Sequence, residues 1–327
     1  MSKRQLILVT GAPRTATTPV GNMLARCNGA LSIYEPLGPT GLARIGTPFP
    51  IVGAGLGIEQ DQLAALVDDL RALRVGRLKA QVRGVRPARL SARIFGSRTL
   101  HSLRLARLQP WSRTIIWKDP HAIFLVPDLM EQELDIVVTA RTPWAHAASY
   151  KRLGWTSKAA QVYPRWSVRY GRCAICERFL GRASHSVVSA ALLWRLSYLC
   201  LIRTGAIGRV HLITSDDLAK DESGTYLSLM RLLRLVPSPA VERELSKSAG
   251  RGRADQLSRK VHDWGRSVES VNSYWKDVLT PEELEQVHEL TCDITPQLFR
   301  TSAQPPDGEG AIVPKRYDLP KGLEVFR

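Results

Sequence analysis

The stretch Leu6–Leu24, with the sequence LILVTGAPRTATTPVGNML, decides the fold of this chain. Its short apolar run, Leu6–Thr10, predicts a buried parallel strand, and apolar residues return at helical spacing after a turn of small residues. A strand, a tight loop and a helix in this order aim backbone N–H groups and the positive end of the helix at one point. The stretch therefore predicts an anion cradle, to which Arg14 adds a guanidinium and the threonines add hydroxyls. The alternative is a strand-to-helix turn without a ligand.

The loop differs from the GxxxxGK[ST] motif that binds nucleoside triphosphates. It lacks the Lys-Ser/Thr end, in which the lysine reaches the outer phosphates and the hydroxyl contacts magnesium. Ordinary nucleoside triphosphate chemistry is therefore disfavoured, and a ligand of phosphate type remains the expectation.

Beyond this loop the chain alternates short apolar runs with helical patterns. This order predicts an α/β fold with a central parallel sheet flanked by helices on both faces, in three layers. Each predicted strand is rich in β-branched or large apolar residues. The predicted strands are Leu6–Thr10, Thr114–Lys118, Asp135–Ala140 and Val210–Thr214. The predicted helices are Pro19–Asn28, Glu59–Arg74, Trp144–Leu153, Ser186–Thr204, Gly224–Leu235 and Pro281–Arg300.

The length of 327 residues fits one large α/β domain or two small ones. We interpret residues 1–300 as one domain with a basic insertion at about residues 58–113. Residues 301–327, rich in Pro, Gly and charge, are interpreted as a tail with little regular structure. No small-residue cleavage site follows the N-terminus, and the apolar stretch Val187–Ile202 contains Arg195 and is short for a membrane span. We therefore expect a buried helix there and a cytoplasmic protein.

The net charge of +16 is concentrated in one segment, Arg71–Arg113, which has no Asp or Glu. A solvated surface normally mixes charges of both signs, so this segment indicates an acidic ligand or surface. Nucleic acid, an anionic glycan and anionic lipid headgroups all fit, and a generally high arginine content without function is the alternative. We expect helices of this segment to line a cleft at the carboxyl edge of the sheet, where open α/β sheets bind their ligands. Its twelve cations are Arg71, Arg74, Arg77, Lys79, Arg83, Arg86, Arg89, Arg93, Arg98, Arg104, Arg107 and Arg113.

The five cysteines are odd in number and scattered, which argues against a disulfide framework. Cys173 and Cys176 have a spacing compatible with zinc, but no second CxxC or paired histidines accompany them. We expect reduced thiols, with a metal or redox site at this pair as the alternative.

A second informative run is Asp135–Pro143, where another strand ends in a polar turn before a helix. Arg141 stands at the carboxyl end of this strand, and Ser149 follows eight residues later. A guanidinium supplies planar, forked donors and a serine adds a compact donor, a pair suited to a terminal phosphate.

Together these motifs resemble those of sulfotransferases, of the bacterial and carbohydrate-sulfotransferase branch. The first loop resembles the family's 5′-phosphosulfate loop, a Pro-Lys/Arg-Ser/Thr-Gly-Thr-Thr-like run, and Arg141 with Ser149 resembles its 3′-phosphate motif, although Thr142 replaces the usual Asp. The match spans roughly Leu6–Phe299 and implies a P-loop-like fold. Further segments that resemble the family, in chain order, are Ile33–Leu37, Trp117–His121, Leu193–Arg195, Val210–Leu218 and Tyr274–Thr280.

The resemblance implies a donor, 3′-phosphoadenosine 5′-phosphosulfate (PAPS), and transfer of its sulfuryl group to an acceptor hydroxyl or amine. Arg14 matches the family's catalytic Lys or Arg and would stabilise charge on the leaving phosphate–sulfate oxygen, helped by the loop N–H groups. No metal is required in principle. The residues implied to hold the donor are Pro13, Arg14, Thr15, Ala16, Thr17, Thr18, Arg141 and Ser149.

An acceptor proton requires a general base. Glu35 is the first choice, because it lies in the Glu-Pro segment that resembles the family's, and a structural ion pair is its alternative. His121 is the rival, although its spacing from Lys118 is one residue longer than in the branches that use a His here. Lys118 is expected to contact the sulfate or an acidic group of the acceptor, with an exposed strand-end lysine as the alternative.

Two departures from the family remain. Pro19 stands where cytosolic members commonly have Trp, so an aromatic that stacks on adenine must come from elsewhere. The late basic loop has no clean counterpart, and Arg251–Arg253 and Ser258–Lys260 are its candidates.

The leading hypothesis is thus a sulfotransferase with a small-molecule or glycan acceptor, an anionic glycan or glycolipid being favoured by charge. Peripheral contact with an anionic membrane also fits the charge. A P-loop-like kinase and a basic nucleic-acid-binding protein are the alternatives. Nucleic acid is disfavoured because the basic segment contains few aromatic side chains that could stack on bases, namely Phe95 and Trp111. The oligomeric state and the acceptor's identity are open.

Overall fold

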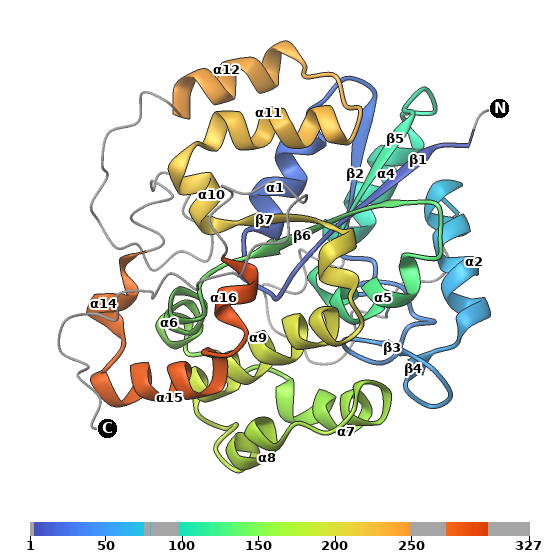
Figure 1. Ribbon diagram of the computed structural model, residues 1–327. Helices are drawn as coiled ribbons and strands as arrows, with labels where there is room; N and C mark the ends of the chain where they lie inside the picture. The colour runs from blue at the N-terminus through green and yellow to red at the C-terminus, as the bar shows by residue number, and fades with distance from the viewer. Residues whose placement is uncertain (1–2, 75–78, 80–97, 249–272, 300–327) are drawn as a thin grey trace, which may run out of the picture.

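The computed structural model describes residues 3–74, 79, 98–248 and 273–299 (Figure 1). A five-stranded, wholly parallel sheet runs through its centre in the order β2–β5–β1–β6–β7. These strands are β1 (Gln5–Thr10), β2 (Ala30–Tyr34), β5 (Thr114–Lys118), β6 (Asp135–Ala140) and β7 (His211–Thr214). Two two-residue strands, β3 (Ile51–Val52) and β4 (Gly57–Ile58), form a separate parallel pair, and they lie between β2 and β5 in the sequence.

Both faces of the sheet are covered, so its central strands are apolar on both sides. Leu6 and Leu8 of β1 belong to one hydrophobic cluster, whereas Ile7 and Val9 belong to a second one. This division follows from the strand's alternation of side chains, and it explains why β1 reads as an unbroken apolar run. The predicted three-layer α/β fold is confirmed.

One face is covered by a thin layer of helices, which lies above the sheet in Figure 1. This layer consists of α1 (Thr17–Leu24), α10 (Ser215–Lys220), α11 (Glu222–Leu232) and α12 (Pro239–Ser248). The other face carries the larger cluster. Its helical elements are α2 (Gln60–Arg71), α4 (Arg98–Arg107), η1 (Pro120–Leu125), α5 (Val126–Leu129), α6 (Pro143–Leu153), α7 (Ala159–Tyr170), α8 (Ala174–Leu180), α9 (Ser186–Arg203), η2 (Ala206–Arg209), α14 (Trp275–Val278), α15 (Pro281–Thr291) and α16 (Thr295–Leu298).

The four predicted strands are present within one residue of their predicted ends. The edge strand β2 was missed, because its five residues alternate between buried and half-buried positions and form no continuous apolar run. The predicted helix Pro281–Arg300 divides into α15 and α16, and it begins at the capping box of Thr280 and Glu283. Among the described residues, seven α-helices, namely α4, α5, α7, α8, α10, α12 and α14, lie outside the predicted helix ranges.

The longest helix, α9, is the only one among the described residues that is long and apolar enough to span a membrane. In the structure 83% of its apolar window is buried inside the protein. It packs mainly against α6, α7 and α15. The predicted buried helix is therefore confirmed, and Arg195 within it is also buried.

The loop between β1 and α1 has an unusual backbone. Arg14 and Ala16 both have positive φ angles, 76° and 72°, although neither is glycine. Gly11 has φ 154°, and a Cβ atom there would lie 2.3 Å from the Thr139 carbonyl oxygen. The left-handed region disfavours side chains, so the loop stores strain at Ala16, directly before α1.

We expect Ala16→Gly to stabilise the protein by about 0.5 to 1 kcal/mol, because glycine removes the strain of the left-handed backbone. The matched control is Ala25→Gly at the other end of α1, where φ is −68°. Both alanines pack against the same cluster. The control should lower the free energy of unfolding, measured by urea denaturation, and an equal loss in both variants would contradict the strain at Ala16.

Candidate functional site

The candidate site lies at the carboxyl ends of the sheet strands. Tyr34, Lys118 and Val9 are paired across β2, β5 and β1, so these three strands end at one level. The residues that follow them are Glu35, Asp119 and Thr10, and the loop to α1 begins at Gly11. In parallel sheets ligands bind at this edge. The topology therefore gathers the predicted motifs at one edge of the molecule.

The loop after β1 is held from below by buried polar side chains. The Thr15 hydroxyl donates to the Ala12 carbonyl oxygen at 2.6 Å and also contacts Thr139. Tyr198 of α9 donates to the Thr139 carbonyl at 2.8 Å, and its hydroxyl accepts from the Ala12 N–H at 3.4 Å. These bonds explain how the strained loop keeps one conformation.

A third support is His146 of α6, which is fully buried. Its Nε2 lies 2.9 Å from the Pro13 carbonyl oxygen, and because a carbonyl only accepts, Nε2 carries the proton. Burial lowers the pKa of His146 to about 3, so the ring is neutral at physiological pH. His146 thus fixes the peptide directly before Arg14 without adding a charge to the cradle.

The two predicted anion motifs meet directly. Arg14 Nε donates to Ser149 Oγ at 3.2 Å, which joins the first loop to α6. The guanidinium carbon of Arg14 also lies 6.0 Å from the ring centroid of Trp155. Burial lowers the pKa of Arg14, which indicates that its charge is poorly solvated. A partly buried guanidinium whose contacts here are a hydroxyl and an indole fits an anionic ligand.

Arg141 lies at the end of β6 and is buried. Its backbone carbonyl accepts a hydrogen bond of 2.8 Å from Trp194 Nε1 of α9. Its guanidinium carbon lies 5.5 Å from the ring centroid of Tyr274, which immediately precedes α14. Trp194 and Tyr198 stand one helical turn apart, so a single face of α9 positions both motifs.

Glu35 and Lys118 form a short ion pair at the ends of β2 and β5. Lys118 Nζ lies 2.6 Å from Glu35 Oε1 and 3.8 Å from the ring centroid of Tyr34. The Lys118 side chain is only 2% exposed, so it is not an exposed strand-end lysine. Its stem passes α1 at Gly21, where a Cβ atom would lie 2.8 Å from Lys118 Cγ. The ion pair therefore holds the Glu35 carboxylate at this edge, in a residue whose φ is 46°.

Asp119 supports the Glu35 segment from beneath and is fully buried. Its two carboxylate oxygens accept hydrogen bonds from the backbone N–H groups of Leu37, at 2.6 Å, and His121, at 2.9 Å. Burial, with the nearby Glu35 charge, raises the pKa of Asp119 to about 7. Asp119 therefore acts as a structural brace that ties the Glu-Pro segment to the end of β5.

His121 is the second residue of the short helix η1 and packs against Phe49, with ring centroids 4.6 Å apart. Its Nδ1 is buried without a hydrogen-bond partner. Burial lowers the pKa of His121 to about 4, so its ring is neutral at physiological pH. The two candidate bases, Glu35 and His121, thus follow neighbouring strands. Asp119 connects their segments, because it accepts hydrogen bonds from the N–H groups of Leu37 and His121.

Pro13 and Ala16 lie in the loop, and α1 begins at Thr17 and Thr18, two residues before the predicted start at Pro19. The first N–H groups of a helix have no acceptor within the helix, and here they belong to Thr17 and Thr18. The buried hydroxyl of Thr15 bonds within the protein, to the Ala12 carbonyl oxygen and to Thr139. Sequence reasoning gave no role to His146, Tyr198 or Asp119. For Asp119 a signal was present in the Lys-Asp-Pro segment, whereas the other two depend on how α6 and α9 pack.

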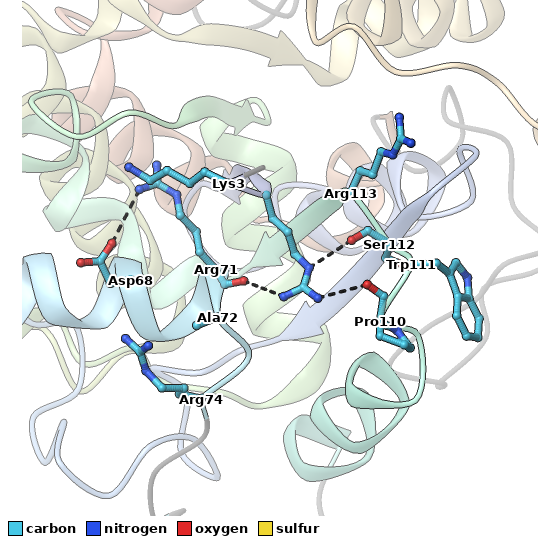
Figure 2. Close-up of a pocket in the computed structure, with 10 residues that line it drawn as sticks. Lys3, Asp68, Arg71, Ala72, Arg74, Pro110, Trp111, Ser112 and Arg113 are labelled. Carbon is cyan, nitrogen blue, oxygen red and sulfur yellow. Dashed lines mark hydrogen bonds and ion pairs between the residues drawn. The ribbon is translucent and has the colours of Figure 1, made fainter. Parts of the chain in front are cut away.

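The expectation for the basic segment was wrong for its described ends. Arg71, Arg74 and Arg113 lie at the amino edge of the sheet, because Arg71 ends α2 and Arg113 directly precedes β5. There they line a cavity of about 590 Å³ together with Lys3 and Arg4 (Figure 2). Arg4 donates to three backbone carbonyls in this region, those of Arg71, Pro110 and Ser112.

Two described cations of this segment, Lys79 and Arg98, lie beside the candidate site. Lys79 Nζ donates to the carbonyl oxygens of Gly38, at 3.0 Å, and Leu37, at 3.4 Å. The guanidinium carbon of Arg98, the first residue of α4, lies 5.8 Å from the ring centroid of Tyr34. Burial lowers the pKa of Lys79. The cations Arg77, Arg83, Arg86, Arg89 and Arg93, the candidate basic loops Arg251–Arg253 and Ser258–Lys260, and the tail 301–327 lie outside the described residues.

No protein-family model matches the chain, and no curated protein matches it. Among solved structures, the chain is similar to the sulfotransferase domain from the olefin synthase of Synechococcus PCC 7002. That likeness has a TM-score of 0.41 and 16% sequence identity, and covers 88% of this chain and 95% of that one. The chain is also similar to sulfotransferase STF1 from Mycobacterium tuberculosis H37Rv, with a TM-score of 0.35, 15% identity, and coverage of 85% of this chain and 77% of that one.

Proposed function

We propose that this protein is a sulfotransferase that moves a sulfuryl group from PAPS to an acceptor hydroxyl or amine. The observation that carries the proposal is the 3.2 Å contact between Arg14 and Ser149. It brings together two motifs that lie 135 residues apart and that, in the sequence, resemble the 5′-phosphosulfate and 3′-phosphate motifs of sulfotransferases. A single ligand with two separated anionic groups accounts for both motifs at one place.

The residues present fit such a donor. Arg14 and the N–H groups at the start of α1 would hold the phosphosulfate, and Arg141 with Ser149 would hold the second phosphate. Gly11 supports this assignment, because a side chain there would collide with Thr139 and fill the turn from which the loop departs. When bound, the donor supplies the sulfuryl group. The neutral His146 beneath Pro13 leaves the positive charge of the cradle to the arginines and the helix start.

Sulfuryl transfer resembles phosphoryl transfer, in which negative charge grows on the leaving oxygen. Arg14 would stabilise this charge, and its partial burial strengthens the interaction because less water competes. The strained loop keeps the guanidinium aimed at the edge of the sheet before a ligand arrives. This pre-organisation reduces the rearrangement needed during transfer.

Glu35 is the proposed general base that takes the acceptor proton. Lys118 holds its carboxylate at 2.6 Å, and Asp119 fixes the backbone of its segment through Leu37. The ion pair observed here serves orientation and leaves the second carboxylate oxygen, Oε2, for the acceptor. His121 remains the rival base, since its ring is neutral and its Nδ1 lacks a partner.

The proposed acceptor is anionic, for example an acidic glycan or a glycolipid. Lys79 and Arg98 support this choice, because both cations lie beside the Glu35 segment. A kinase and a nucleic-acid-binding protein are the competing functions. Transfer of radiolabelled sulfate to a panel of glycans, lipids and small phenols tests the acceptor class, and labelling of small phenols alone would count against an anionic acceptor.

Two arginine variants test the residues proposed to bind the donor. Arg14→Ala and Arg141→Ala should each lower sulfuryl transfer by about 100-fold or more, because each removes a charge-assisted contact to the donor. Arg113→Ala at the opposite edge of the sheet is the matched control and should keep full activity. Thermal unfolding of all three variants verifies the fold, and full activity of Arg14→Ala would refute its assigned role.

The donor class has its own test, which needs no acceptor. Adenosine 3′,5′-bisphosphate should raise the unfolding temperature of the unmodified protein, because a ligand that binds the native state stabilises it. ATP with magnesium should give no comparable shift. The reverse result would support a kinase, and salt-sensitive DNA binding with no effect of either nucleotide would support a nucleic-acid-binding protein.

A further prediction separates the two bases. Glu35→Gln should lower kcat at saturating donor by about 100-fold or more, since general base catalysis typically accelerates a reaction by roughly 10²–10⁴-fold. His121→Ala should retain most of its kcat. The bisphosphate should still stabilise both variants, which shows that the donor site survives. The opposite order of kcat values would assign the proton transfer to His121.

A further inference from the structure

The CxxC pair, Cys173 and Cys176, forms a side-chain cluster beside α9. Cys173 immediately precedes α8, and Cys176 lies in its first turn. Both are buried, Cys176 completely. Tyr163 fixes this turn, because its hydroxyl accepts from the Cys173 N–H at 3.0 Å and donates to Glu177 at 2.7 Å. The two thiols are close enough for each to shift the pKa of the other.

Arg195 of α9 faces this pair from within the core. Its Nε donates to Cys173 Sγ at 3.3 Å. Its other nitrogens bind both carboxylate oxygens of Asp293, at 2.6 and 2.9 Å, and the Leu290 carbonyl at 2.8 Å. Only 4% of the Arg195 side chain is exposed, whereas 47% of the Asp293 side chain is. A buried guanidinium therefore stands directly against one sulfur of a dithiol.

This arrangement makes the two thiols chemically unequal. A hydrogen bond from Cys176 and the adjacent guanidinium lower the pKa of Cys173, whereas its hydrogen bond to Cys173 and burial raise the pKa of Cys176. A thiolate is the nucleophilic form of cysteine. The pair thus contains one activated sulfur and, three residues away, one thiol able to react with its oxidised form.

We infer that Cys173 and Cys176 are a redox-active dithiol that hydrogen peroxide closes to a disulfide. The Cys173 thiolate attacks the peroxide oxygen, the O–O bond breaks, and hydroxide leaves, which produces a sulfenic acid. The Cys176 thiol then attacks the Cys173 sulfur, an S–S bond forms, and water leaves. Two electrons pass from the two sulfurs to the peroxide, and a dithiol reductant reverses the reaction by thiol–disulfide exchange.

Peptide mass spectrometry tests this inference. The full-length reduced protein is treated with hydrogen peroxide, and it is then denatured and alkylated. The expected product is a Cys173–Cys176 disulfide that dithiothreitol removes. The single exposed thiol, Cys292, is the internal control and should react about tenfold more slowly. The inference would be overturned if Cys292 were oxidised while Cys173 and Cys176 stayed reduced and were therefore alkylated.

Two matched variants assign the roles within the pair. In Cys176→Ser the sulfenic acid at Cys173 should accumulate and react with dimedone, because the resolving thiol is gone. In Cys173→Ser no adduct should form at Cys176. Adduct at Cys176 but not at Cys173 would overturn the assignment, and since the readout is thiol chemistry, it is independent of sulfuryl transfer.

Arg195 is tested as a positioning residue by Arg195→Lys and by the pH profile. The lysine variant should lower the rate of disulfide formation by about tenfold at pH 6, with a smaller difference at pH 9, where thiols ionise without assistance. If that variant does not fold, the pH profile of the unmodified protein decides. A rate that persists well below the usual cysteine pKa supports the contact, and a rate that falls like that of an ordinary thiol contradicts it.

Discussion

The candidate site depends on one constraint, namely that the strained loop after β1 is held by buried polar groups of α6 and α9. Arg14 and Ala16 occupy left-handed backbone conformations that are unfavourable for side chains. His146 and Tyr198 offset this cost by bonding the backbone of the loop and of β6. Without these bonds the loop could relax, and Arg14 would no longer meet Ser149.

A second group of buried polar residues shapes the neighbouring edge. Lys118 and Asp119 follow one another at the end of β5, and both are buried. Lys118 is balanced by Glu35, whereas Asp119 is bonded by two backbone N–H groups. Because an unpaired buried charge is costly, removing either partner of the ion pair would disturb more than that one contact. The Glu35 segment is thus positioned by electrostatics as well as by packing.

The sequence predicted those features that follow from local pattern. The strands β1, β5, β6 and β7 were recognisable from their apolar runs, and the meeting of Arg14 and Ser149 follows from strand ends sharing one edge. Contacts that depend on helix packing could not be predicted, and Tyr198 is the clearest case, since nothing local in α9 distinguishes it. Only part of the basic segment lies at the predicted edge of the sheet, because charge reveals no direction along the sheet. Arg71 and Arg113 lie at the opposite edge, where α2 ends and β5 begins. Lys79 and Arg98 lie at the predicted edge.

The two hydrophobic clusters differ greatly in size, and the loop after β1 crosses from one to the other. Ala12 belongs to the large cluster, whereas Ala16 packs against the small one under α1, α11 and α12. A thin layer has fewer buried contacts and therefore opens more readily than the rest of a protein. An anion bound between Arg14 and the start of α1 would contact both, and it would therefore link the two layers. Binding of an anion would then slow the exchange of backbone amide hydrogens throughout α1, including amides that do not touch the ligand.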